Sequence, residues 1–310
     1  MKIGIRVLAI IAILSLCFTF NNRFLLNYYN NSALYGSFLQ KRERAEKIDV
    51  EKIIVVGGSA SNLGFDSKYF EQLSGKPAVN LAVSAGIPLK VYMRAAELCA
   101  KNGDVLIMPL EYDYYNSDID EICESYVDMV GVDPDLKCDE NLWNSIEYYS
   151  IMFLRSFTRM NDCIVFALKN LMGSENTIYI ADSVDEYGDF CLHKDRIPTY
   201  VSTANVIQFK HNSETLHRIY DFIKQMEQKG VTVYLTYPCV DRNQFMDCEQ
   251  YFAEVQQIVE DYIPTKNIIG TPSAFGYDPE FFFDTAYHIR YENREIYTEK
   301  LFTLYNQIIQ

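Results

Sequence analysis

A chain of 310 residues, 49% of them hydrophobic, is long enough for one large domain or two small ones with a well-filled core. The formal net charge of -14 at pH 7 argues against a nucleic-acid partner, because such affinity comes mainly from Lys and Arg that neutralise phosphates. The simplest interpretation of this charge is solubility.

The N-terminus carries the first predicted element. Residues Val7 to Phe20 contain no charged side chain and follow Lys2 and Arg6, a pattern typical of an export signal or a membrane anchor. No small-x-small cleavage pattern follows, so we interpret residues 1–22 as a retained transmembrane signal anchor, with a cleaved signal peptide as the alternative. This interpretation predicts a single-pass membrane protein with an extracytoplasmic domain.

Residues 23–50 end in a highly charged stretch, which predicts a solvated helical stalk or linker between the anchor and the domain. The domain is expected to span residues 51–310. Apolar runs rich in β-branched residues predict buried parallel strands at 52–56, 78–82, 104–108 and 231–235. Helical spacing of apolar residues predicts helices at 88–101, 213–228 and 292–308. This alternation implies right-handed crossovers and an α/β fold with a mostly parallel sheet covered on both faces.

The segment from about 117 to 210 interrupts the alternation. It contains an acidic amphipathic helix near 119–129, a helical region around 142–172 and a turn-rich stretch at 182–189. We interpret it as a helical insertion that either shapes a substrate cleft or only covers hydrophobic surface.

Gly57, Gly58 and Ser59 directly follow the first predicted strand, where an open parallel sheet binds its ligands. The glycines allow a sharp turn and leave room for a substrate, so Ser59 is a candidate nucleophile. The alternative is that Ser59 caps the next helix and the glycines serve only the bend.

A second candidate group lies near the other end of the chain, where Asp284 precedes His288. A serine hydroxyl becomes a good nucleophile only when an imidazole accepts its proton and a third group orients that imidazole. The sequence therefore offers the parts of a serine hydrolase.

Four blocks occur in order along the chain: the Ser59 turn with Gly64-Phe65-Asp66-Ser67, then Asn80 to Gly86, Pro109 to Tyr112, and Asp284 to His288. In this order residues 50–310 resemble the SGNH (GDSL-like) hydrolase superfamily, particularly its membrane-anchored bacterial members associated with modifying cell-surface polymers. The resemblance implies a flavodoxin-like three-layer α/β/α sandwich with a Ser-His-Asp esterase or acyltransferase site.

The resemblance also assigns roles. Ser59 would be the nucleophile and its N–H the first oxyanion donor, and the Gly86 N–H would be the second donor. His288 would be the general base and Asp284 would orient it, with Asp278 as a fallback.

The chain departs from the family in its third block. The family supplies an oxyanion asparagine there, whereas this chain has Glu111, and a carboxylate cannot donate unless it is protonated. Asn116 or Asn62 are the candidate replacements.

We therefore expect an extracytoplasmic serine esterase or O-acyltransferase whose substrate is a carbohydrate or acylated polymer of the cell envelope. The alternative is an inactive scaffold of the same fold in an envelope polymer acylation or export complex. No cofactor or metal is expected, because no Cys or His stands at regular metal-ligand spacing. The histidines outside the candidate site, which also lack this spacing, are His193, His211 and His217.

Overall fold

In the computed structural model, the structure describes residues 34–138, 141–158, 184–203, 210–245 and 248–310, together with a few isolated positions before 20 and at 165 and 168. The chain divides into two compact units. One unit contains Met1–Gly36 and Ile122–Ala181, and the other contains Ser37–Glu121 and Asp182–Gln310. The second unit contains the sheet.

The central sheet has five parallel strands in the order β2-β1-β3-β4-β6. These are β1 (Ile53–Val55), β2 (Ala78–Asn80), β3 (Val105–Pro109), β4 (Thr232–Thr236) and β6 (Ile268–Ile269). Every residue of β1, β2 and β3 is buried, which explains their continuous apolar sequences. A second, two-stranded parallel sheet pairs β5 (Val240–Asp241) with β7 (Gly276–Tyr277).

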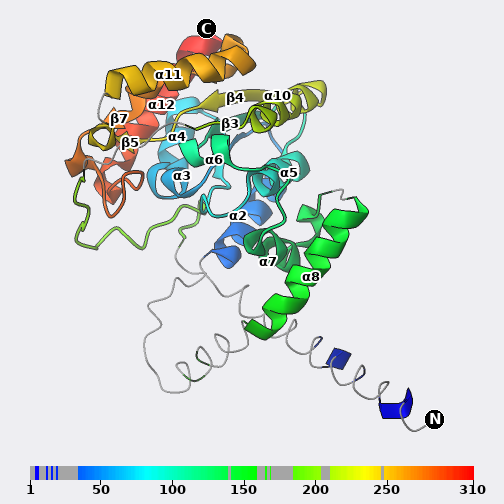
Figure 1. Ribbon diagram of the computed structural model, residues 1–310. Helices are drawn as coiled ribbons and strands as arrows, with labels where there is room; N and C mark the ends of the chain where they lie inside the picture. Colours follow the sequence, from blue (N-terminus) through cyan, green and yellow to red (C-terminus); the bar gives the residue numbers. More distant parts are fainter. Residues whose placement is uncertain are drawn as a thin grey trace. The chain divides into compact units, whose positions relative to one another are not determined.

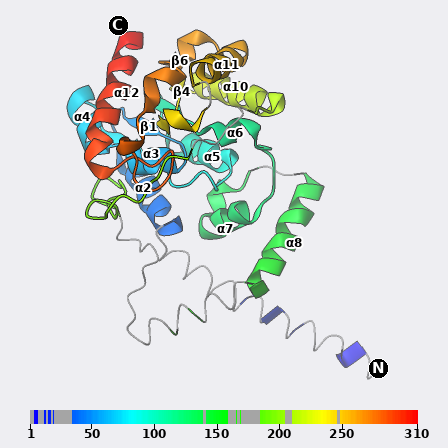
Figure 2. The same ribbon diagram turned by 60° about the vertical axis from the view of Figure 1, so that its left-hand side comes forward.

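Helices fall into two groups around this sheet (Figure 1, Figure 2). The first group contains α3 (Ser59–Gly64), α4 (Ser67–Ser74) and α12 (Arg294–Ile309), which contact one another. The second contains α5 (Leu89–Cys99), α10 (Ser213–Gln228) and α11 (Cys248–Tyr262). Right-handed crossovers place the two groups on opposite faces. The result is a mixed α/β unit consistent with three layers.

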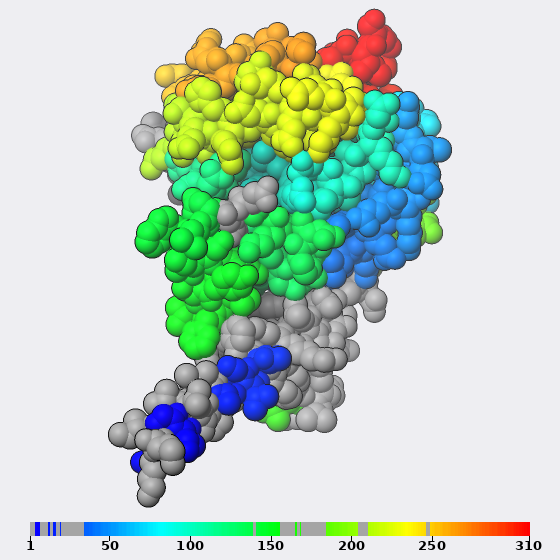
Figure 3. Space-filling model, turned by 90° about the vertical axis from the view of Figure 1, so that its right-hand side faces the viewer, coloured from blue at the N-terminus to red at the C-terminus, as the bar shows by residue number. Residues whose placement is uncertain are grey.

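Figure 3 shows the second group from outside, with α10 in yellow-green between α11 in orange and α5 in cyan. Glu97 of α5 accepts hydrogen bonds from Gln225 of α10 and from Lys229, which directly follows α10, at 2.7 and 2.8 Å. The apolar face of α10 is buried against the sheet, as its helical spacing predicts.

Most of the other helical elements outside α7 and α8 are short. They are α2 (Tyr35–Lys47), α6 (Tyr112–Asn116) and the 3₁₀ turns Arg242–Gln244, Thr265–Asn267, Pro272–Phe275, Pro279–Phe281 and Tyr291–Asn293. Side-chain caps begin two of the larger helices: Asp66 accepts the N–H of Tyr69 in α4, and Asn212 accepts the N–H of Glu214 in α10.

The other unit contains α7 (Glu124–Val132), a 3₁₀ turn at Pro134–Leu136 and α8 (Leu142–Thr158). Arg155 of α8 pairs with Asp128 of α7, and both side chains are buried. Tyr35 donates a second hydrogen bond to Asp128 at 3.0 Å.

Two predictions on the N-terminal region have different outcomes. Most of the predicted anchor at 1–22 lies outside the described residues, and within the described part no helix is long and apolar enough to cross a membrane. The predicted solvated stalk differs from the structure: α2 buries Phe38, Lys41 and Ala45 completely. These residues recur at helical spacing, so this helix belongs to the packed fold.

Candidate functional site

The candidate site lies where β1 and β3 end side by side. From the first strand the chain crosses to β2 on one side, while β3 lies on the other, so the strand order reverses at this point. Ligands of open α/β sheets bind in the crevice outside the carboxyl ends of strands at such a reversal. Ser59 follows β1 and Glu111 follows β3.

Two close approaches explain the glycines before Ser59. A Cβ on Gly57 would lie 2.9 Å from the carbonyl oxygen of Pro109, and one on Gly58 would lie 2.7 Å from the backbone nitrogen of Ala85 and 2.7 Å from Glu111 Oε2. Gly58 has φ -96°, so a side chain is excluded by contact with its neighbours rather than by backbone strain.

Glu111 holds this turn. Its Oε2 accepts the N–H of Gly58 and its Oε1 accepts the N–H of Ala60, both at 2.8 Å. The side chain is buried, with 1% of the residue exposed. Burial raises the pKa of Glu111, whereas the N–H groups of Ala60 and Gly58 and the charge of His288 lower it. From the sequence, Glu111 was considered only as the residue that stands in place of the family's oxyanion asparagine, and its bonds to this turn were not predicted.

Ser59 is partly exposed and begins α3. Within the described part of the chain, neither its N–H nor its hydroxyl has a hydrogen-bond partner. The first turn of α3 is closed by the N–H of Asn62, which donates to the carbonyl of Gly58 at 3.1 Å. Both reactive groups of Ser59 are therefore available to a ligand.

Asp284 and His288 form a pair on the loop before α12. Asp284 Oδ1 lies 2.7 Å from His288 Nδ1, and the two side chains are 37% and 19% exposed. Thr285 Oγ1 accepts the N–H of His288 at 3.2 Å, and the N–H of Phe283 donates to the His288 carbonyl at 2.7 Å. These bonds form a tight loop in which Asp284 reaches His288, four positions later in the chain. The loop leaves His288 Nε2 for another partner.

The histidine loop contacts the serine helix. A Cβ on Gly64 of α3 would lie 2.7 Å from Ile289 Cδ1, so Ile289 packs directly against the end of that helix. The charge of His288 also acts on Glu111. No hydrogen bond between Ser59 and His288 occurs in the described chain; such catalytic hydrogen bonds are often long in ligand-free sites and tighten when substrate binds.

Three other predicted site residues lie elsewhere or have other partners. Gly86 is exposed and its N–H donates to Ser84 Oγ at 3.1 Å, whereas the N–H of Ala85 lies beside Gly58. Asn62 is buried and accepts a hydrogen bond from Lys41, at 2.6 Å. Asp278 pairs with Arg242 at 3.4 Å, so it does not orient His288. Ala85 is thus better placed than Gly86 to supply a second oxyanion donor.

Asn116 is exposed at the end of α6, and no side-chain hydrogen bond connects it to Ser59 or Glu111 in the described residues. It is therefore not part of the site as it stands.

A buried charged cluster lies next to these elements, and sequence reasoning missed it. Lys41 donates hydrogen bonds to Asn62 Oδ1 and to the carbonyl of Ala82. Through Lys41, these two bonds connect α3 with the loop after β2. Asp189 accepts from the N–H and hydroxyl of Ser67 and pairs with Arg294 at 3.2 Å. Burial lowers the pKa of Lys41 to about 7, against the attraction of Asp189.

The remaining histidines contact aromatic rings. His193 is buried among Phe190, Phe283 and Tyr291, and burial lowers its pKa to about 4. His211 and His217 make ring contacts with Tyr262. In the part of the chain that the structure describes, no cluster of three or more His, Cys, Asp or Glu could hold a metal ion.

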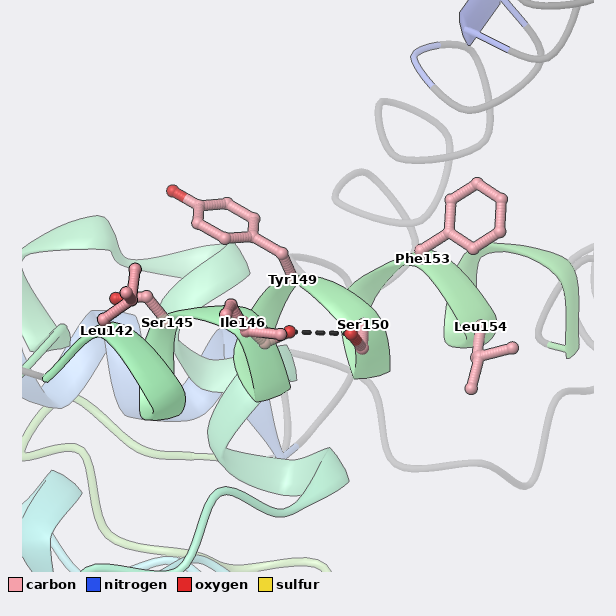
Figure 4. Close-up of a pocket in the computed structure, with 7 residues that line it drawn as sticks. All are labelled: Leu142, Ser145, Ile146, Tyr149, Ser150, Phe153 and Leu154. Atoms are coloured by element: carbon pink, nitrogen blue, oxygen red, sulfur yellow. Dashed lines mark hydrogen bonds between the residues drawn. The ribbon is translucent and has the colours of Figure 1, made fainter.

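The other unit carries an exposed apolar surface on α8 (Figure 4). Side chains at helical spacing line a shallow groove there: Leu142, Ser145, Ile146, Tyr149, Ser150, Phe153 and Leu154. Neighbouring Trp143 is 76% exposed. None of these lining side chains is charged, and the Ser150 hydroxyl donates to the carbonyl of Ile146 at 2.7 Å.

No family model and no curated protein matches this chain.

Proposed function

We propose that this protein is a serine esterase or O-acyltransferase of the SGNH type. The observation that carries the proposal is the 2.7 Å contact between Asp284 and His288, on a loop whose next residue packs against the helix that Ser59 begins. The strand order supports the same conclusion, because doubly wound flavodoxin-like sheets also place their second and third strands on either side of the first.

In the proposed reaction, Ser59 Oγ attacks the carbonyl carbon of an ester. His288 Nε2 takes the hydroxyl proton and returns it to the leaving alcohol, while Asp284 holds Nδ1–H and stabilises the imidazolium. The free N–H of Ser59 donates to the oxyanion, with the N–H of Ala85 as the second candidate donor. Water or a sugar hydroxyl then accepts the acyl group from Ser59.

The substrate class and location in this proposal come from the sequence. The uncharged run from Val7 to Phe20 suggests a membrane anchor with an extracytoplasmic domain, and the family resemblance suggests acylated carbohydrate of the cell envelope as substrate. Protein partners are not specified.

A fluorophosphonate probe tests the proposed nucleophile. We expect the full-length protein to be labelled on Ser59, and we expect Ser59→Ala to remain unlabelled. Failure of the folded wild-type protein to react contradicts the proposal.

One observation favours a second candidate, an inactive scaffold in an envelope acylation complex: Glu111 occupies the place of the oxyanion asparagine. Cells that carry Ser59→Ala or His288→Gln distinguish the two functions. If polymer acetylation is normal in both variants but lost on deletion of the protein, the scaffold is correct.

A further inference from the structure

Glu111 binds the backbone on both sides of the candidate nucleophile. We propose that Glu111 is a positioning residue that fixes the backbone on both sides of Ser59. This inference rests on the proposed function and adds a residue that the usual Ser-His-Asp set lacks.

The first argument is geometric. Three consecutive N–H groups, those of Gly58, Ser59 and Ala60, stand at the start of α3, and Glu111 binds the outer two at 2.8 Å each. The middle N–H, that of Ser59, has no partner in the described residues. Glu111 therefore fixes the turn without occupying the one donor that belongs to the nucleophile itself.

The second argument is chemical. Only an ionised carboxylate offers two acceptor oxygens of equal quality, whereas a glutamine would turn an NH₂ group toward one of the two N–H donors. Because Glu111 is 1% exposed, water cannot replace a lost bond there. The Gln variant thus leaves one N–H of the serine turn unsatisfied.

The third argument is electrostatic. The charge of His288 acts on Glu111, so a negative Glu111 favours the imidazolium that forms when His288 takes the Ser59 proton. Two other titratable groups act with His288: Asp284, whose Oδ1 lies 2.7 Å from Nδ1, and His193, whose pKa burial lowers to about 4, so that it is neutral near pH 7. The groups whose charges act with that of Glu111 are also neutral near pH 7; they are Tyr92, Tyr114, Tyr115, Cys239, Tyr287 and Tyr297. Burial raises the pKa of each of them.

The test measures the rate at which a fluorophosphonate labels Ser59 between pH 5 and 9 in the full-length protein. In this reaction Ser59 Oγ bonds to phosphorus, fluoride leaves and the hydroxyl proton passes to His288. We expect Glu111→Gln to lower the rate about 10²-fold, the usual cost of a misplaced reactive group. We also expect the acid limb of its pH–rate profile to move to lower pH, because the imidazolium loses a favourable charge.

Asp104→Asn is the matched control. Asp104 is also a buried carboxylate that accepts two backbone N–H groups, those of Lys52 and Lys101, but it lies at the opposite end of β3. This variant should be less stable, yet its rate and pH profile should match the wild type. Equal changes in both variants, or a Glu111→Gln variant with an unmoved acid limb, overturn the proposal.

Glu111→Asp serves as the second variant and replaces Gln if that variant does not fold. The charge is retained but the side chain is one methylene shorter, so we expect a lower rate with the acid limb in place. An Asp variant with the wild-type rate overturns the positioning role. Absence of labelling in the wild type contradicts the proposed function and this inference together, whereas a labelled wild type with an unchanged Gln variant contradicts this inference alone.

Discussion

Gly58 shows how a single residue constrains the candidate site. Its missing side chain leaves the space that Glu111 and the backbone of Ala85 occupy. We predict that Gly58→Ala destabilises the fold by about 1–3 kcal/mol, as overpacking of buried sites does, and slows labelling of Ser59 at least tenfold. Chemical denaturation and the rate of probe labelling measure the two effects.

Gly86→Ala is the control for this prediction. A Cβ at Gly86 meets its nearest neighbour, Ser84 Oγ, at 3.5 Å, which is an ordinary contact on an exposed loop. This variant should keep wild-type stability. If both alanine variants are equally stable, the packing around Gly58 is looser than described.

At the residue scale, the sequence predicted which side chains meet when they are close along the chain. Asp284 and His288 are four positions apart, and a short loop brings them together. The role of Glu111 could not be predicted, because its partners Gly58 and Ala60 are 53 and 51 positions away and meet it only through the pairing of β1 with β3. Likewise, the hydrogen bond from Lys41 to Asn62 Oδ1 joins residues 21 positions apart and leaves no local signal in the sequence.

At the scale of elements, α2 contributes an unusual buried lysine. The folded-state pKa of Lys41 is about 7 against an ordinary value of 10.5. Between these values the unfolded chain binds a proton that the folded chain does not, so lowering the pH from 10.5 to 7 favours unfolding. The wild type should therefore lose stability relative to Lys41→Met as pH falls, by up to about 1.4 kcal/mol per pH unit, with no further change below pH 7.

Urea denaturation of both proteins between pH 7 and 10 tests this prediction. Lys47→Met is the control, because Lys47 lies on the same helix with 71% of its side chain exposed and pairs with Glu43 of α2. Its stability difference from the wild type should be nearly independent of pH. A flat difference for Lys41→Met as well would mean that Lys41 keeps its proton in the folded state.

Elements with a strong apolar pattern were predictable and those that depend on tertiary contacts were not. Strands predicted at 52–56, 104–108 and 231–235 correspond to β1, β3 and β4 within one residue at each end, and the strand predicted at 78–82 corresponds to β2 within two residues. By contrast, β6 has only Ile268 and Ile269, too short a run to give a period. The charged residues of α2 predicted a solvated helix or linker, whereas one side of the observed helix is buried.

At the scale of the whole molecule, the candidate site belongs to one unit. Ser59, Glu111, Asp284, His288 and the charged cluster all lie in the unit formed by Ser37–Glu121 and Asp182–Gln310. We predict that these two segments, joined by a flexible Gly/Ser linker in place of residues 122–181, fold cooperatively and keep Ser59 reactive. Thermal unfolding and probe labelling test this; a protein that cannot fold would show that the units depend on each other.

The alternation of strands and helices predicted the parallel sheet, because connection rules leave few topologies for such a pattern. The predicted insertion at 117–210 differs in extent from the observed division, since residues from 182 onward belong with the sheet. Thr199 and Tyr200 donate their N–H groups to the carbonyl of Phe283, next to Asp284. Such long-range pairing leaves no local signal in the sequence.

The most direct test of the account is the rate of fluorophosphonate labelling, with the modified residue located by peptide mass spectrometry, in the wild type and in His288→Gln. The account predicts that Ser59 carries the label and that loss of His288 slows the reaction at least 10²-fold, because the hydroxyl then has no base. A label on another residue, or a Ser59 that reacts equally fast without His288, would contradict it.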